Sequence, residues 1–427
     1  MSGARRAALD AMNAFRRGTF SSEALDASIR ASKLDARDAA LCERIVRETL
    51  RNRTYIDFVL GQWSSRPMDK VEYAVLDILR TGAAQILFLD RVPPSAAVNE
   101  AVKLCRERGH DRAAGFVNGV LRRVAEHRES LPQVPGEGSA EYLSVRYSHP
   151  LWLAQEFIAR RGYDGAEALC AADNAEPQIV IQTNTLKTSP SELESALSEA
   201  GISARPGICG GSFELSGAGA VAALPGFSEG LFYVQDPAAR LAVESTGLEP
   251  GMKVLDACSA PGGKSFAAAM LMRGKGKILA CDLKEGRLKR VSDGAGRLGI
   301  EIIETRRMDA RHPGEELSGA FDVVIADVPC SGFGVIRRKP EIRFKPREEF
   351  ARLPEIQLDI LTSLAGCVKP GGVLLYSTCT LFERENEDVV RAFLSRSGGF
   401  TVTQQRTLWP DINKTDGFFI CRMVKSI

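Results

Sequence analysis

Apolar residues return every three or four positions along roughly the first 130 residues of the chain, which is the spacing of one helix face. The pattern is clearest at residues 41–50, 73–89 and 115–124. Pro93 and Pro94 interrupt it, and a new helical pattern follows them. Because no alternating strand pattern occurs here, we predict an all-α domain over residues 1–130.

A stretch rich in Pro and Gly, residues 131–140, predicts a linker after this domain. The next segment has a helix pattern at residues 151–162, an apolar strand pattern at 177–185 and a second helix pattern at 191–201. We therefore predict a small α+β module over residues 141–235.

From about residue 250, short apolar strand patterns alternate with helix patterns. The strand patterns lie at residues 253–257, 277–282, 301–307, 321–327 and 372–378. This alternation predicts a parallel sheet with helices on both faces. Two later strand patterns, at residues 400–408 and 417–425, predict a hairpin at one edge of the sheet. We assign residues 236–427 to this α/β domain, so the chain is expected to be multidomain.

The composition is that of an ordinary globular protein, with 44% hydrophobic and 26% charged residues among 427. The formal net charge is only +2, so any site for a nucleic acid has to be a local basic patch. The arginines within the first 53 residues are either a solvated helix surface or such a patch.

The ten cysteines form no CxxC pair, and only four histidines are present, so we expect no metal site. Free thiols at this density are typical of a reducing cytoplasm. The chain has no apolar run of membrane-spanning length, and its first residues lack the apolar core of a secretory signal. We therefore expect a cytoplasmic protein with no membrane contact.

The loop after the first strand of the α/β domain favours a bound ligand. It reads CSAPGGKS, and Gly262 with Gly263 lets the backbone approach an anionic group at the start of a helix. Four consecutive strands end in or just before an acid, namely Asp256, Asp282, Asp309 and Asp327. Ligands of doubly wound sheets bind beyond these strand ends, where Asp282 can accept hydrogen bonds from ribose hydroxyls.

The same loop also resembles the end of an ATP-binding P-loop, which makes an ATPase an alternative. A P-loop requires Gly five residues before Gly263, where this chain has Cys258. Pro261 also lies inside the loop. These two departures disfavour the ATPase.

Cys330 follows the fourth strand and Cys379 follows the fifth, each in a short polar turn. Neighbouring strand ends face one cleft, so the two thiols are expected to meet there, the alternative being that they pack as small apolar residues. A thiolate that adds to carbon 6 of a pyrimidine makes carbon 5 electron-rich enough to accept a methyl group. Asp327 is placed to hydrogen-bond ring nitrogen 3 and the amino group of such a base.

Three segments resemble the core motifs of the Sun-type RNA cytosine-5 methyltransferases: DACSAPGGKS at 256–265, ADVPCSGFGVIRRKPEIRF at 326–344 and YSTCTLFERENE at 376–387. The resemblance implies a Rossmann-like class I methyltransferase domain that uses S-adenosylmethionine. It also implies that Cys379 is the nucleophile and that Cys330 assists product release. The cofactor contacts that it implies are Cys258, Ser259, Ala260, Pro261, Gly262, Gly263, Lys264, Asp282, Asp309 and Asp327.

Residues 79–104 and 115–124 resemble the NusB-type helical RNA-binding domain. This fusion is similar to bacterial methyltransferases of 16S ribosomal RNA. The resemblance therefore implies 16S RNA, unassembled or partly assembled, as the partner. Gln182 stands where related proteins often have Arg, which puts one phosphate contact in doubt.

A basic run follows the Pro-Cys motif, and its candidate RNA contacts are Arg337, Arg338, Lys339 and Arg343. The alternative is a solvated loop, but the run lies next to the expected cleft. The target cytosine has to be unpaired or flipped outward, because stacking hides its ring atoms.

Two other functions stay open at this point. One is a transfer-RNA cytosine-5 methyltransferase, which only the analogy of the NusB-like domain disfavours. The other is a non-catalytic RNA-binding or ribosome assembly factor, which the intact acids and thiols disfavour.

Overall fold

The computed structural model describes residues 2–19, 21–217 and 219–427. The chain divides into two compact units. The first unit, here called the helical unit, contains residues 1–175 and also residues 336–345. The second, here called the catalytic unit, contains residues 176–335 and 346–427.

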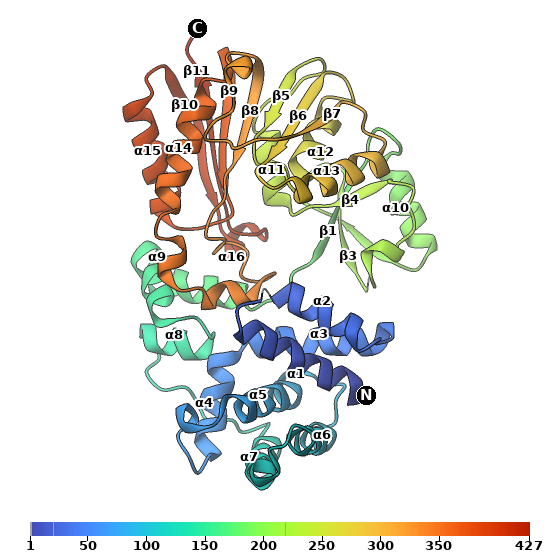
Figure 1. The fold of residues 1–427 in the computed structure, drawn as a ribbon, viewed down its shortest axis with the longest axis vertical. Helices are drawn as coiled ribbons and strands as arrows, with labels where there is room; N and C mark the ends of the chain where they lie inside the picture. The colour runs from blue at the N-terminus through green and yellow to red at the C-terminus, as the bar shows by residue number, and fades with distance from the viewer. Residues whose placement is uncertain (1, 20, 218) are drawn as a thin grey trace. The chain divides into compact units, whose positions relative to one another are not determined.

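The described residues of the helical unit form helices and no strand, as the periodicity predicted (Figure 1). The α-helices are α1 (Ser2–Arg16), α2 (Ser21–Ala31), α3 (Ala36–Arg51), α4 (Arg53–Trp63), α5 (Tyr73–Phe88), α6 (Pro94–Glu107), α7 (Ala114–Glu126), α8 (Ala140–Arg146) and α9 (Leu151–Asp173). The last two lie in residues that we had placed in the middle module. The compact helical unit therefore extends to residue 175.

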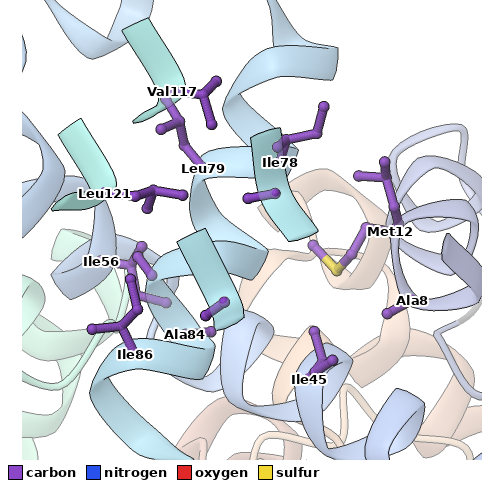
Figure 2. Close-up of a cluster of buried hydrophobic side chains, with 14 of the residues drawn as sticks. Ala8, Met12, Ile45, Ile56, Ile78, Leu79, Ala84, Ile86, Val117 and Leu121 are labelled. Carbon is purple, nitrogen blue, oxygen red and sulfur yellow. The ribbon is translucent and has the colours of Figure 1, made fainter. Parts of the chain in front are cut away.

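Helix α5 is the centre of the helical unit, because every residue from Val75 to Ile86 along it is buried. A helix that is buried on all sides has to be covered by neighbours all round. Figure 2 shows Ile78 and Leu79 of α5 among side chains of α1, α3, α4 and α7. At Gly82, an added Cβ would lie 2.7 Å from Leu121 Cδ1, so glycine lets α5 and α7 approach closely.

The catalytic unit begins with a small antiparallel sheet of order β2-β3-β1-β4. Its elements are β1 (Ile179–Thr183), α10 (Pro190–Glu199), β2 (Ser203–Pro206), β3 (Ser212–Ser216) and β4 (Phe232–Val234). Helix α10 starts with a capping box between Ser189 and Glu192, and it packs Leu193 and Leu197 against the sheet. The strand and the helix that we predicted here are confirmed.

The large sheet of the catalytic unit has the order β10-β11-β9-β8-β5-β6-β7. Its strands are β5 (Lys253–Asp256), β6 (Lys277–Asp282), β7 (Ile303–Arg307), β8 (Phe321–Asp327), β9 (Val368–Thr378), β10 (Phe400–Leu408) and β11 (Phe418–Lys425). Strands β5 to β9 pair in parallel, and β10 and β11 form the predicted antiparallel hairpin at one edge.

Each face of the large sheet has its own hydrophobic core. On one face, α11 (Pro237–Glu244), α12 (Gly263–Leu271) and α13 (Glu285–Leu298) cover the strands. On the other face lie α14 (Leu353–Ala365) and α15 (Glu387–Arg396) (Figure 1). The short α16 (Pro410–Asn413) lies between the last two strands in the chain. The predicted α/β layering is confirmed. Across the described ranges, no helix is long and apolar enough to cross a membrane.

Candidate active site

The strand order places the candidate residues at one point of the sheet. Strands β6 and β7 follow β5 in order on one side of it, and the next strands in the chain, β8 and β9, lie on the other side of β5. This reversal is the switch point where doubly wound sheets bind ligands. Asp256 pairs in register with Ile325 of β8, and Asp327 pairs with Ser377 of β9. The loops that follow these strands therefore meet.

The two predicted thiols do come together. Cys330 Sγ lies 3.1 Å from Cys379 Sγ, and both side chains are half-buried. The hydrogen bond to Cys379 and then burial raise the pKa of Cys330 well above its usual value. This shift favours Cys330 as the thiol that keeps its proton, although either sulfur could donate across the contact. A thiol that donates to a neighbouring sulfur stabilises a thiolate there.

Asp327 lies beside the thiols in an ion pair with a lysine of the glycine loop. Lys264 Nζ donates to Asp327 Oδ2 at 2.6 Å, and Ser377 Oγ donates to Asp327 Oδ1 at 2.8 Å. Burial works against the charge on Lys264, but the attraction of Asp327 outweighs it, and the pKa of Lys264 is raised. The site therefore carries a fixed cation next to a carboxylate, and this cation favours a thiolate at Cys379.

The glycine loop, residues 258–265, turns sharply from β5 into α12. Gly262 is the N-cap of α12 with a φ of 112°, a left-handed conformation that favours glycine. An added Cβ at Gly262 would lie 2.5 Å from the ring of Phe266. Ser265 Oγ donates to Asp256 Oδ2 at 2.7 Å, while burial raises the pKa of Asp256 to about 6. These contacts fix the first turn of α12 beneath the loop.

Several buried polar atoms around this loop fit a polar ligand. Asp256 Oδ1, Ser259 Oγ and Gln235 Oε1 are buried and have no hydrogen-bond partner within the protein. Unsatisfied buried polar atoms are rare in native proteins unless a ligand or water completes them. Together with the close backbone approach at Gly262, they suit S-adenosylmethionine, which carries polar groups at both ends.

The other predicted cofactor acids lie at the neighbouring strand ends. Asp282 ends β6 and accepts a hydrogen bond from the Lys284 main-chain N–H at 2.9 Å. Asp309 pairs with Arg311 at 2.7 Å, and the hydrogen bonds from Arg311 lower the pKa of Asp309 to about 2. Burial raises the pKa of Cys258, which therefore stays a thiol. Whether these three residues contact the cofactor stays a prediction.

Comparisons with known proteins match most of the chain. The family model for the 16S rRNA methyltransferase RsmB/F matches residues 246–424, the NusB family matches residues 2–126, and an RsmF/B-like ferredoxin-like domain matches residues 149–222. A Bacillus subtilis protein named probable ribosomal RNA small subunit methyltransferase B is 35% identical over 426 residues, 95% of each chain. The chain belongs to the RsmB/F methyltransferase family.

Solved structures of similar fold include two with more than 25% sequence identity. PH0851 has a TM-score of 0.83 and 27% identity, and the match covers 100% of this chain and 99% of that one. A methyltransferase homolog from Pyrococcus horikoshii has a TM-score of 0.60 and 26% identity, and the match covers 66% of this chain and 97% of that one. As a member of the RsmB/F family, the protein is a methyltransferase that uses S-adenosylmethionine.

The predicted RNA contacts of this RsmB/F chain separate into two groups. Lys339 is exposed, while Arg337 and Arg338 are half-buried. Arg343 is fully buried, and its guanidinium donates to the main-chain oxygens of Arg51, Tyr147 and Ser148 and to Asn174 Oδ1 at 2.8 to 3.1 Å. The prediction is therefore wrong for Arg343, because its side chain is fully buried inside the helical unit and cannot meet phosphate.

Gln182, which stands in place of the related proteins' arginine, is also buried. Its Nε2 donates to the main-chain oxygen of Gln235 at 3.3 Å, within the small sheet. Arg5 and Arg51 of the N-terminal arginines are buried as well. These two belong to the interior of the helical unit and not to an RNA-facing surface.

Sequence reasoning missed the residues that hold the thiol loops in place. Gly334 N–H donates to the main-chain oxygen of Cys379 at 2.9 Å, and Gly417 N–H donates to the Gly334 oxygen at 2.7 Å. An added Cβ at Gly334 would lie 2.0 Å from the Gly417 oxygen, so only glycine fits. Glu385, Asn386 and Gln357 are fully buried beside the same loops. The sequence signal was a polar run at residues 383–388 directly after an apolar strand.

Across the described ranges, no group of three or more His, Cys, Asp and Glu side chains could hold a metal ion.

Proposed function

We propose that this chain methylates carbon 5 of a cytosine in 16S ribosomal RNA through a covalent bond between Cys379 and the cytosine. The observation that carries the proposal is the pair of thiols, 3.1 Å apart, beside the ion pair of Lys264 and Asp327. The name of the Bacillus subtilis relative supports RNA of the small ribosomal subunit as the substrate.

Each residue of the site has a task in this reaction. Lys264 and the S–H of Cys330 favour the thiolate of Cys379, which adds to carbon 6 of the cytosine. Ring nitrogen 3 takes up a proton from water as the thiolate adds and returns it when the ring double bond re-forms. In between, the Asp327 carboxylate accepts hydrogen bonds from this N–H and from the amino group. S-adenosylmethionine, when bound, supplies an electrophilic methyl group for carbon 5. Once the carbon 5 proton has passed to solvent, the ring double bond re-forms and Cys379 leaves as a thiolate, which the S–H of Cys330 stabilises.

The cofactor contacts in this proposal are the glycine loop, Cys258 to Lys264, together with Asp282, Asp309 and Asp327. Arg337, Arg338 and Lys339 are the proposed RNA contacts. The RNA is unassembled or partly assembled, because the target base has to be unpaired or flipped to reach the thiols. A ribosomal RNA substrate supports a cytoplasmic location for the protein.

Bisulfite sequencing of ribosomal RNA tests reaction and target together. RNA is compared from cells that carry the protein, lack it, or carry Cys379→Ser. We expect one 16S cytosine to be protected only with the intact protein. Protection of a transfer-RNA position instead would show the transfer-RNA enzyme, and full protection with Cys379→Ser would overturn the covalent route.

A further inference from the structure

All four residues that flank the two thiols are held by one buried polar cluster. The cluster consists of Gln357 on α14 and of Glu385 and Asn386, which directly follow the Thr-Cys loop. Each of these three side chains is completely buried. Because buried polar side chains need partners, the bonds that they make fix the conformation of the loops around them.

Glu385 and Gln357 hold the loop that carries Cys330. Glu385 accepts hydrogen bonds from the Ser331 N–H at 2.9 Å and from Ser331 Oγ at 2.5 Å. Gln357 Nε2 donates both to Glu385 Oε2 and to the main-chain oxygen of Pro329, each at 2.9 Å. The residues before and after Cys330 are thus both tied to Glu385, one directly and one through Gln357.

Asn386 holds the loop that carries Cys379. Thr378 Oγ1 donates to Asn386 Oδ1 at 2.6 Å, and Asn386 Nδ2 donates to the main-chain oxygen of Thr380 at 3.0 Å. The two loops are joined by a hydrogen bond of 2.9 Å between Ser331 Oγ and Thr380 Oγ1. Each thiol therefore has its own anchor, and the anchors are adjacent residues of the chain.

We propose that Glu385 is a positioning residue for the release of the methylated RNA, and Asn386 a positioning residue for the attack by Cys379. This division rests on the proposed function, in which Cys330 acts at release and Cys379 at addition. The hydrogen bonds of Glu385 go to Ser331 and Gln357, and its charge also helps to raise the pKa of Cys330. In this proposal it acts by keeping Cys330 Sγ within 3.1 Å of Cys379 Sγ.

The step that depends on Glu385 is the breaking of the bond between Cys379 and carbon 6. The proton on carbon 5 passes to water, its electron pair re-forms the double bond between carbons 5 and 6, and the sulfur–carbon pair returns to Cys379. The S–H of Cys330 stabilises the sulfur as it leaves. If the Cys330 loop moves away, release slows while addition continues, and covalent enzyme–RNA adduct accumulates.

The test compares Glu385→Gln with Asn386→Leu, using unmodified 16S RNA and S-adenosylmethionine. Glu385→Gln keeps the volume but turns an amide toward the donors of Ser331 and Gln357. We expect its kcat to fall by roughly tenfold, with the KM for S-adenosylmethionine unchanged and a larger share of enzyme in denaturation-resistant adduct. Asn386→Leu is expected to lower both kcat and the share of enzyme in the covalent adduct.

Glu383→Gln is the matched control, because Glu383 lies in the same short turn with an exposed side chain. Gln357→Met is the second variant in case Glu385→Gln does not fold. It removes the Pro329 anchor, and it also removes a buried Oε1 atom that has no partner. We expect it to raise the adduct share in the same direction by a smaller factor.

Wild-type adduct levels and turnover in Glu385→Gln and Gln357→Met would overturn the inference. So would a loss of adduct together with turnover in Glu385→Gln while S-adenosylmethionine binding stays intact. If the wild-type chain itself forms no adduct and methylates no RNA, the proposed function fails instead, so the two failures are distinguishable.

Discussion

Arg343 in the helical unit and Glu385 in the catalytic unit are both charged side chains with no solvent exposure, yet they hold different parts of the chain in place. Arg343 donates to groups of Arg51, Tyr147, Ser148 and Asn174, which lie on parts of the helical unit that are distant in sequence. Glu385 accepts hydrogen bonds from Ser331, which follows Cys330, and from Gln357. Gln357 in turn donates to the main-chain oxygen of Pro329, which precedes Cys330. The comparison teaches that a buried charged side chain fixes the chain in both units, and that in the catalytic unit the loop fixed in this way carries Cys330.

Replacing Arg343 tests the structural half of this comparison and has the largest expected effect. Arg343→Met leaves three buried main-chain oxygens without their donor, so the free energy of unfolding should fall by roughly 3–5 kcal/mol. Urea denaturation of the free protein measures it. Lys339→Met, an exposed change in the same segment, should alter the stability little. Unchanged stability of Arg343→Met would show that this guanidinium is not an anchor.

Asp327→Asn tests the chemical half. The amide keeps the shape of the side chain but loses the ion pair with Lys264, so kcat should fall by roughly a hundredfold to a thousandfold. Stability should change less than for Arg343→Met. Methyl incorporation from labelled cofactor measures kcat. A decrease in kcat of only a few-fold would rule out a role for Asp327 at the base.

Asp256 is a buried acid of the catalytic unit, and its contribution to stability depends on pH. Burial raises its pKa from 3.8 to about 6 in the folded protein, so the folded state holds this proton more tightly than the unfolded state. That stabilisation is complete below pH 3.8 and is lost as the pH rises through 6. Asp256→Asn does not titrate, so between pH 4 and 7 the wild type should lose roughly 2–3 kcal/mol relative to it. Parallel stability curves for the two free proteins, measured without cofactor, would contradict this result.

The smallest expected effect concerns the basic residues of the helical unit that are not fully buried. Changing Arg337 and Arg338 together to Gln should weaken RNA binding and make the plot of log affinity against log salt shallower by about one to two units. Binding of 16S RNA fragments at several salt concentrations measures the slope. Arg352→Gln, at an exposed arginine of the catalytic unit, serves as the control. An unchanged slope in the double variant would leave the helical unit with no phosphate contact at these positions.

The elements of both units could be predicted because their periodicity is local. Strands β5 to β9 and the final hairpin follow from apolar runs, and the switch point follows from the alternation of strands and helices. Cys330, Cys379 and Asp327 could be predicted as one site, because strand ends of a parallel sheet meet at one edge.

Burial of a charged residue could not be predicted in the same way. Arg343 lies in a run of basic residues, and nothing local distinguishes it from Arg337. Its partners at Arg51 and Asn174 become neighbours only through folding. Likewise, the contact between Gly334 and Gly417 joins two loops that are distant in sequence. The compact helical unit extends past the stretch of linker composition at residues 131–140, since α8 and α9 follow that stretch.

The most direct test of the central claim is to find where the RNA is bound during the reaction. A 16S RNA fragment carrying 5-fluorocytidine is incubated with the protein and S-adenosylmethionine. Fluorine replaces the proton on carbon 5, and since fluorine cannot leave as that proton does, the enzyme stays bound to the RNA. Protease digestion and mass spectrometry then locate the nucleotide. We predict that it is attached to the peptide containing Cys379. Attachment at Cys330, or methyl transfer to unmodified RNA with no trapped adduct, would contradict covalent catalysis by Cys379.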